Sequence, residues 1–145
     1  MSVELEDMYN QFILRRVPKN WTFYGYLSLK PLGSWFDDLL QRVAFMNEWV
    51  EKGTLPSYWV SCFYFPQGFM TAVLQTYARK TKTPIDELVF QTIVRKEAPA
   101  KIFSIPEDGV NIHGMILEGC NWNSERNTLV ESEKKQLFVE VPTIW

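Results

Sequence analysis

Apolar residues recur every three or four positions in three stretches of the first 80 residues, which is the spacing of amphipathic helices. The first stretch covers residues 1–17 and stops before Pro18, which would end a helix. Its apolar positions are Leu5, Met8, Tyr9, Phe12, Ile13 and Val17. Residues 21–32 have no clean period and finish in Lys30-Pro31-Leu32-Gly33, so we predict a turn-rich connector there.

The second and clearest helix is predicted for residues 34–52. Ser34 can cap its first turn, and Gly53 supplies the left-handed residue that often ends a helix. Trp35 and Trp49 stand fourteen positions apart, close to four helical turns, so both lie on one side. We therefore expect both indole rings to anchor this helix.

The third helix is predicted for residues 66–80 and ends in a short basic run, Arg79-Lys80-Thr81-Lys82. Cations at the carboxyl end of a helix complement its dipole, which accounts for this run without any ligand. An acidic partner or a phosphate group is the alternative explanation. We favour the structural one.

After residue 83 the pattern changes to the alternation and β-branched content that are typical of strands. We predict strands at residues 88–94, 110–117 and 137–141, with a turn at 106–109 before the second of them. Helices first and strands afterwards predict an α+β fold with antiparallel pairing.

Length and composition suit one domain over residues 1–145, with a helical part over about 1–83 and a β part over about 84–145. Because 46% of the residues are hydrophobic and 22% are charged, wholesale disorder is ruled out. The formal net charge of -2 argues against a nucleic-acid-binding domain. No apolar run approaches the roughly 18 to 20 residues needed to cross a membrane, and we expect neither nucleic acid nor membrane as a partner.

Motifs for common enzymatic chemistry are missing from the sequence. A phosphate-binding loop needs a glycine followed directly by lysine, and no such pair occurs. The Gly-x-Ser-x-Gly nucleophile motif is also missing. The adjacent carboxylates Asp37-Asp38 and Glu107-Asp108 fit a helix start and a turn better than an acid–base pair. We therefore predict no catalytic, cofactor-binding or metal-binding residues.

His113 is the only histidine, and Cys62 and Cys120 are the only cysteines. A catalytic site or a metal site would need folding to bring these three residues together. The simpler interpretation is a strand histidine and two buried free thiols, because structural zinc sites usually show closely paired ligands.

Aromatic residues make up 15% of the chain, which indicates either a heavily buried domain or a surface that a partner covers. The residues that we single out as structural or interface candidates are Trp35, Trp49, Trp59, Phe65, Phe69, Arg79, Lys80 and Trp122.

Several short segments, in a fixed order, resemble the C-terminal domain of dynein heavy chains. They are Ser28–Trp35 followed by Asp38, Leu39, Arg42, Phe45 and Trp49; Phe65–Phe69; Leu74-Gln75; Tyr77–Lys80; Pro84–Asp86; Glu107–Val110; His113-Gly114; Leu117–Gly119; Trp122; and Pro142–Trp145. Each segment alone is weak, but together they span about residues 10–145. The Pro-Gln-Gly-Phe and Tyr-Ala-Arg-Lys segments resemble axonemal heavy chains more than the cytoplasmic transport motor.

The resemblance implies helices followed by an antiparallel, barrel-like sheet. It also implies a non-catalytic regulatory domain that packs on the AAA+ ring of its own heavy chain and modulates microtubule-based motility. ATP would be bound by the parent chain only. Dynein complex subunits and microtubules would be partners through that parent motor. The expected location is the cytoplasm and cytoskeleton, in the axoneme of a cilium or flagellum.

The chain departs from the family in its length. Dynein heavy chains are far longer, and the family domain continues past the Pro142–Trp145 segment into further strands. We therefore expect a fragment with an incomplete barrel, in which Val139 and Val141 face solvent and favour self-association. Two rival hypotheses are a small free-standing enzyme that uses His113 with a Cys or Ser nucleophile, and an adaptor that binds a partner through its aromatic residues.

Overall fold

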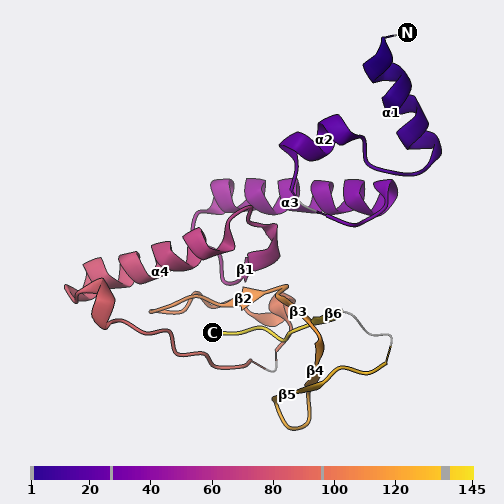
Figure 1. Ribbon diagram of the computed structural model, residues 1–145. Helices are drawn as coiled ribbons and strands as arrows, with labels where there is room; N and C mark the ends of the chain where they lie inside the picture. The colour runs from indigo at the N-terminus through magenta and orange to yellow at the C-terminus, as the bar shows by residue number, and fades with distance from the viewer. Residues whose placement is uncertain (1, 27, 96, 135–137) are drawn as a thin grey trace. The chain divides into compact units, whose positions relative to one another are not determined.

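A computed structural model describes residues 2–26, 28–95, 97–134 and 138–145 (Figure 1). The chain divides into two compact units, Met1–Glu51 and Lys52–Trp145, and each is described by itself. None of the helices in the described ranges combines the length and apolar character that a bilayer crossing requires. The boundary between a helical and a β part at residue 83 stays a prediction.

The described part of the first unit contains the helices α1 (Val3–Ile13), α2 (Lys19–Tyr24) and most of α3 (Leu32–Lys52). The predicted first helix is confirmed, with Ser2 as its N-cap, but it ends four residues early at Ile13. Arg15 then takes a left-handed φ of 55°. Helix α2 overlaps the first residues of the stretch 21–32, which we predicted to be a connector.

The predicted second helix is confirmed as α3, which begins two residues before Ser34. The Pro31 carbonyl accepts the first helical hydrogen bond, from the Trp35 N–H at 2.9 Å. The prediction that Ser34 caps this helix is therefore wrong, because Ser34 already lies inside the first turn. Gly53 follows the last turn with the expected positive φ of 74°.

The described residues of the second unit form helix α4 (Pro66–Thr81), three short 3-10 helices and six short strands. The 3-10 helices are η1 (Val60–Cys62), η2 (Ile85–Glu87) and η3 (Pro99–Lys101). The strands are β1 (Tyr58–Trp59), β2 (Ile112–His113), β3 (Ile116–Glu118), β4 (Cys120–Asn123), β5 (Thr128–Glu131) and β6 (Phe138–Glu140). Helix α4 matches the predicted range, and Lys82 closes it in the left-handed conformation.

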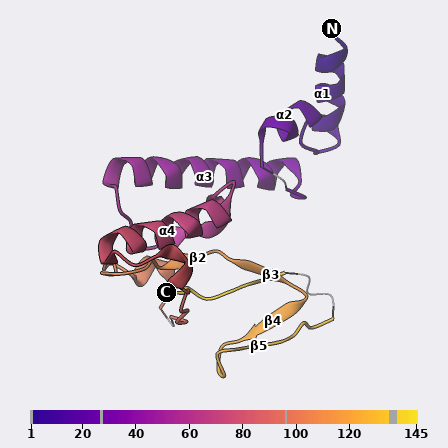
Figure 2. The ribbon, with the colours of Figure 1, turned by 60° about the vertical axis from the view of Figure 1, so that its left-hand side comes forward.

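The strands of the described residues pair in three two-stranded sheets, and they close no barrel. β3 pairs with β6 and β4 pairs with β5, both antiparallel, and Figure 2 shows the β4–β5 pair as a hairpin. β1 pairs with β2 in parallel, which corrects the expectation of antiparallel pairing alone. The chain runs through α4 between these two strands, and so long a crossover permits parallel pairing. The α+β class itself is confirmed.

The three predicted strands agree with the observed strands to different extents. Residues 110–117 are broken into β2 and β3 at Gly114, which has a φ of 71°. Residues 138–140 form β6, whereas Leu137 lies outside the described residues. The strand predicted at 88–94 is wrong apart from a bridge between Val94 and Ile144, because residues 89–92 meet no pairing partner among the described residues.

The core of the second unit is small and lies around β1 and β2. Its buried apolar side chains are Leu55, Tyr58, Val60, Cys62, Ile112 and Val141. Val141 is therefore buried instead of facing solvent, and its N–H donates to the Met115 carbonyl at 2.9 Å. The expectation that this residue is exposed is wrong, and self-association at the carboxyl end stays a prediction.

Candidate functional site

A buried ion cluster fixes the connector before α3 onto that helix. Asp38 is only 6% exposed, and its carboxylate lies 2.7 Å from Lys30 Nζ and 2.7 Å from Arg42 Nε. Arg42 stands one helical turn after Asp38, whereas Lys30 reaches back from the connector. A buried carboxylate is stable only when such partners compensate for its lost hydration.

Aromatic rings surround this cluster. The Arg42 guanidinium lies 4.0 Å from the centre of the Tyr26 ring, and Tyr26 stacks on Trp35 at 5.8 Å. The Tyr26 hydroxyl donates to the Trp35 carbonyl at 3.1 Å. Trp21 of α2 approaches Trp35 at 6.0 Å. The connector and two helices of the first unit therefore meet at one ion–aromatic cluster, which we define as Tyr26, Lys30, Trp35, Asp38 and Arg42.

Burial and charge shift two pKa values in the ion–aromatic cluster. Burial by itself raises the pKa of Asp38, but hydrogen bonds from Arg42 and Lys30 outweigh it and lower that pKa to about 2. Burial, followed by the nearby Asp38 carboxylate, raises the pKa of Tyr26 to about 12. The cluster is therefore an ionised carboxylate between two cations at neutral pH.

Acid should weaken this cluster. Because the pKa of Asp38 is lower in the folded state, its stabilisation is complete above its unfolded value of about 4 and is lost as the pH falls towards 2. A shift of this size corresponds to about 2.5 kcal/mol. Urea unfolding of the parent chain and of Asp38→Asn at several pH values measures this contribution to stability. The parent should lose more stability between pH 4 and 2 than the variant, and parallel pH profiles would contradict the assignment.

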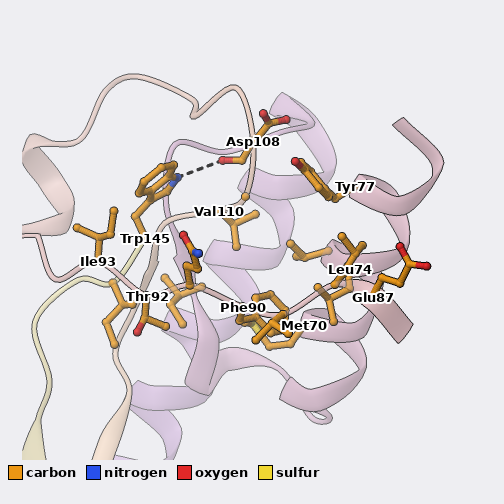
Figure 3. Close-up of a pocket in the computed structure, with 17 residues that line it drawn as sticks. Met70, Leu74, Tyr77, Glu87, Phe90, Thr92, Ile93, Asp108, Val110 and Trp145 are labelled. Atoms are coloured by element: carbon orange, nitrogen blue, oxygen red, sulfur yellow. Dashed lines mark hydrogen bonds between the residues drawn. The ribbon is translucent and has the colours of Figure 1, made fainter. Parts of the chain in front are cut away.

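An open cavity of about 590 Å³ lies in the second unit (Figure 3). Helix α4 supplies Met70, Leu74 and Tyr77 to its wall, and the segment after η2 supplies Phe90. The lining is mainly apolar, and its charged members, Glu87 and Asp108, are acidic. Ligand pockets commonly have volumes of about 300–1,000 Å³, so the cavity has a size that suits binding.

Asp108 joins three distant segments at the edge of this cavity. Lys80 Nζ lies 2.6 Å from its carboxylate and 3.1 Å from the Glu107 carbonyl. Trp145 Nε1 donates to the Asp108 carbonyl at 3.1 Å, as the dashed line in Figure 3 shows. The hydrogen bond to Asp108 raises the pKa of Lys80. The exposed Lys80 therefore has a structural partner, which supports the interpretation of its basic run as a helix end.

Backbone ladders hold the last residues of the chain beside the cavity. Ile93 and Trp145 exchange two hydrogen bonds, of 2.6 and 2.8 Å. Ile144 and Ile112 exchange two more, of 2.8 and 2.9 Å. Segments that carry the sequence resemblance, at 74–80, 107–110 and 142–145, thus meet around one site.

The other aromatic candidates lie in different environments. Phe69 stacks on Phe63 at 4.5 Å and approaches Tyr58 at 5.0 Å, so it belongs to the aromatic packing beside β1. Phe65, one residue before α4, is exposed. Trp122 is half-buried in β4, opposite Leu129 of β5.

The three remaining candidates also differ in exposure. Trp49 is half-buried near the end of α3, whereas Arg79 is exposed on α4. Trp59 is half-buried beside Gly114. The structure thus brings Lys80 together with Asp108, and Trp35 with Tyr26, but it does not gather all eight candidates at one site. Their roles as anchors or interface residues stay predictions.

Sequence reasoning missed the partner of His113. The Ser57 hydroxyl lies 2.8 Å from His113 Nδ1, between residues 56 positions apart. Burial lowers the pKa of His113, and the charge of Glu140 opposes this shift. No carboxylate of the described residues forms a hydrogen bond with His113. Neither Cys62 nor Cys120 is in a disulfide, and no group of three potential metal ligands occurs within the described ranges.

Comparison with known proteins matches the whole chain to one family. The family described as the C-terminal domain of the dynein heavy chain matches residues 1–145. Dynein axonemal heavy chain 1 of Mus musculus is 44% identical over 145 residues, which are 100% of this chain and 3% of that protein. Dynein axonemal heavy chain 3 of Mus musculus is 43% identical over 146 residues, covering 100% of this chain and 4% of its own length.

Dynein axonemal heavy chain 6 of Homo sapiens is 38% identical over 164 residues, covering 99% of this chain and 4% of its own length. The chain thus spans only a few per cent of the length of these relatives. The match nevertheless runs over the whole of the chain, including the segments that form the ion–aromatic cluster and the cavity edge. This chain belongs to the family formed by the C-terminal domains of dynein heavy chains, and it is of the axonemal type.

Proposed function

We propose that this chain is a non-catalytic module that packs on the AAA+ ring of its own axonemal dynein heavy chain and modulates microtubule-based movement. The observation that carries the proposal is an exposed apolar stripe on α3, which we define as Phe36, Leu40, Val43 and Val50. All four side chains are exposed, and Val50 is 85% exposed. A helix face that stays in water usually carries charged and polar residues instead.

The stripe is separate from the face that holds the ion–aromatic cluster. At 100° per residue, its four positions fall within one narrow sector of the helix. Trp35, Asp38 and Arg42 point to a neighbouring sector, where they are already covered or half-covered. One face of α3 thus holds its own unit together, and the next face is left for a partner.

Large exposed apolar side chains also occur on the other two helices of this unit. On α1 and at its end they are Val3, Leu5, Tyr9, Phe12, Ile13 and Leu14, and on α2 they are Phe23 and Tyr24. Exposed apolar side chains in this number support an interaction surface on this unit. Because this chain matches only a few per cent of its relatives' length, the rest of the heavy chain is the partner that we infer.

Other parts of the proposal follow from the parent motor. ATP binding, microtubule contacts and contacts with dynein complex subunits would belong to the rest of the heavy chain. The place of action would be the axoneme of cilia or flagella. The Ser57–His113 pair is the observation nearest to an enzyme site, but neither residue lines the 590 Å³ cavity. We therefore do not propose a free-standing enzyme.

Crosslinking within the intact motor tests the ring contact. A photoreactive amino acid replaces Leu40, in the exposed stripe, in a full-length axonemal heavy chain that carries this sequence. A matched particle carries the same group at Glu125, an exposed residue of the β4–β5 turn. Mass spectrometry then identifies the peptides that each position captures.

A further inference from the structure

The exposed apolar stripe on α3 has an acidic border along one side. At 100° per residue, a sector of about 60° next to the stripe contains three carboxylates. They belong to Asp37, Glu48 and Glu51, which are all exposed and which we define as the acidic flank. The other two residues of this sector, Gly33 and Ala44, are uncharged. The helix therefore presents charge of a single sign beside the stripe.

The side of the stripe opposite the acidic flank is already covered. It holds Asp38, whose carboxylate pairs with both Lys30 and Arg42. In the acidic flank, by contrast, neither Asp37 nor Glu51 has a side-chain hydrogen bond or an ion pair with the described residues. Charges inside the unit thus compensate Asp38 but leave these two carboxylates facing outward.

The position of Glu51 has no explanation in the stability of α3. Glu51 lies in the last turn of this helix, which ends at Lys52. The helix dipole leaves partial negative charge at a carboxyl end, so a carboxylate there is unfavourable and a cation is favourable. A cation on a partner surface would give Glu51 the compensation that its own helix does not.

On the basis of the proposed packing on the AAA+ ring, we infer that the ring surface under α3 is an apolar groove with a cationic wall. Lysine or arginine side chains of that wall meet the acidic flank, and the floor of the groove receives the stripe. Amphipathic helices bind grooves through their apolar face, and complementary charges at the edge fix the orientation of the complex. The acidic flank would thus set the rotation of α3 about its axis.

The sign of the flank distinguishes this occupant from a lipid surface. Helices that lie on membranes carry lysine and arginine beside their apolar face, because the headgroup surface is anionic. The three carboxylates of the acidic flank would be repelled from such a surface. Nucleic acid is disfavoured for the same reason, since its phosphates are anionic. A protein surface that offers apolar side chains and cations fits both the stripe and its border.

Charge reversal in a full-length axonemal heavy chain tests the cationic wall. The chain carries the photoreactive group at Leu40, either alone or together with Asp37→Lys and Glu51→Lys. The double reversal should lower the yield of crosslinks from Leu40 to the ring about tenfold, because like charges would then meet at the groove edge. Glu125→Lys makes the same type of charge change in the exposed β4–β5 turn and should leave the yield unchanged.

A neutral variant separates the effect of charge from an effect of side-chain shape. Asp37→Asn with Glu51→Gln keeps the size of both side chains, so it should lower the yield less than the double reversal does. Its yield should also depend less on salt concentration than that of the parent, since salt screens exposed ion pairs. Urea unfolding of the 145-residue chain should show Glu51→Lys to be at least as stable as the parent. Lost crosslinks would then report docking and not unfolding.

The packing on the ring and the cationic wall fail in different ways. If Leu40 in the parent particle gives no crosslinks to the ring, both are wrong. If the parent gives these crosslinks and the double reversal gives them in the same yield, the stripe packs on the ring without a cationic wall. A yield that falls equally with Glu125→Lys would also overturn the wall, because the effect would then be one of overall charge.

Discussion

Replacing Gly114 with alanine should lower the free energy of unfolding by about 3 kcal/mol. A Cβ atom at this position would lie 2.3 Å from Cδ1 and 2.5 Å from Nε1 of the Trp59 indole. The backbone φ of 71° adds strain for any side chain. Trp59 belongs to β1, which pairs with β2 one residue before Gly114. The substitution should therefore loosen the β1–β2 pair as well as lower stability.

Gly33→Ala provides the matched control. Gly33 lies in the first turn of α3, and its added Cβ would meet no atom within 4 Å. Alanine should therefore stabilise this helix by about 0.5–1 kcal/mol. Urea unfolding of both variants measures the contrast. Equal stabilities for Gly114→Ala and the parent chain would show that Trp59 does not enforce glycine at position 114.

Truncating Trp35 to alanine should have the largest effect in the first unit, about 3–5 kcal/mol. The Trp35 side chain is 4% exposed, stacks on Tyr26 and approaches Trp21. Its loss would leave a cavity beside the Asp38 carboxylate and let water reach the buried ion pairs. The melting temperature should fall by about 10 °C.

Trp49→Ala is the control variant. It shows whether the loss of stability in Trp35→Ala is specific to Trp35 or follows from removing any tryptophan of α3. Both residues lie on α3, but Trp49 is only half-buried, so its truncation should lower the melting temperature less. Calorimetry of the two variants compares them. If Trp35→Ala melted within a degree or two of the parent protein, the ion–aromatic cluster would not be the anchor of this unit.

The long helices could be predicted because each keeps apolar spacing over at least three turns. Helix α2 could not, since its six residues include Lys19 and Asn20 and are too few to show a period. The start of α3 was missed because Pro31, and not Ser34, provides the first hydrogen-bond acceptor. By residue type alone, the helix could begin after either Pro31 or Ser34.

The strands were harder because their pairing is not local. Residues 88–94 have strand composition, but the described residues offer a partner only near Val94. All of β5 is exposed, so no apolar alternation marks it in the sequence. At Gly114, the indole of Trp59 requires a break that alternation alone does not show.

The contacts within the two sites were also hard to predict, because most of them join residues far apart in the sequence. Asp38 and Arg42 could be paired by their spacing on one helix, although the notable partner, Tyr26, comes from the connector. Lys80 reaches Asp108 across 28 positions, and Ser57 reaches His113 across 56. Such contacts depend on the tertiary fold, so the sequence could suggest candidate residues but not their partners.

The crosslinking measurement in intact axonemal dynein tests the proposed role most directly. With the photoreactive group at Leu40, we expect crosslinks to peptides of the AAA+ ring of the same heavy chain. The particle labelled at Glu125 should give few or none. If the group at Leu40 formed no protein crosslink in an intact particle, or crosslinked only to other subunits, packing of the α3 stripe on the ring would be contradicted.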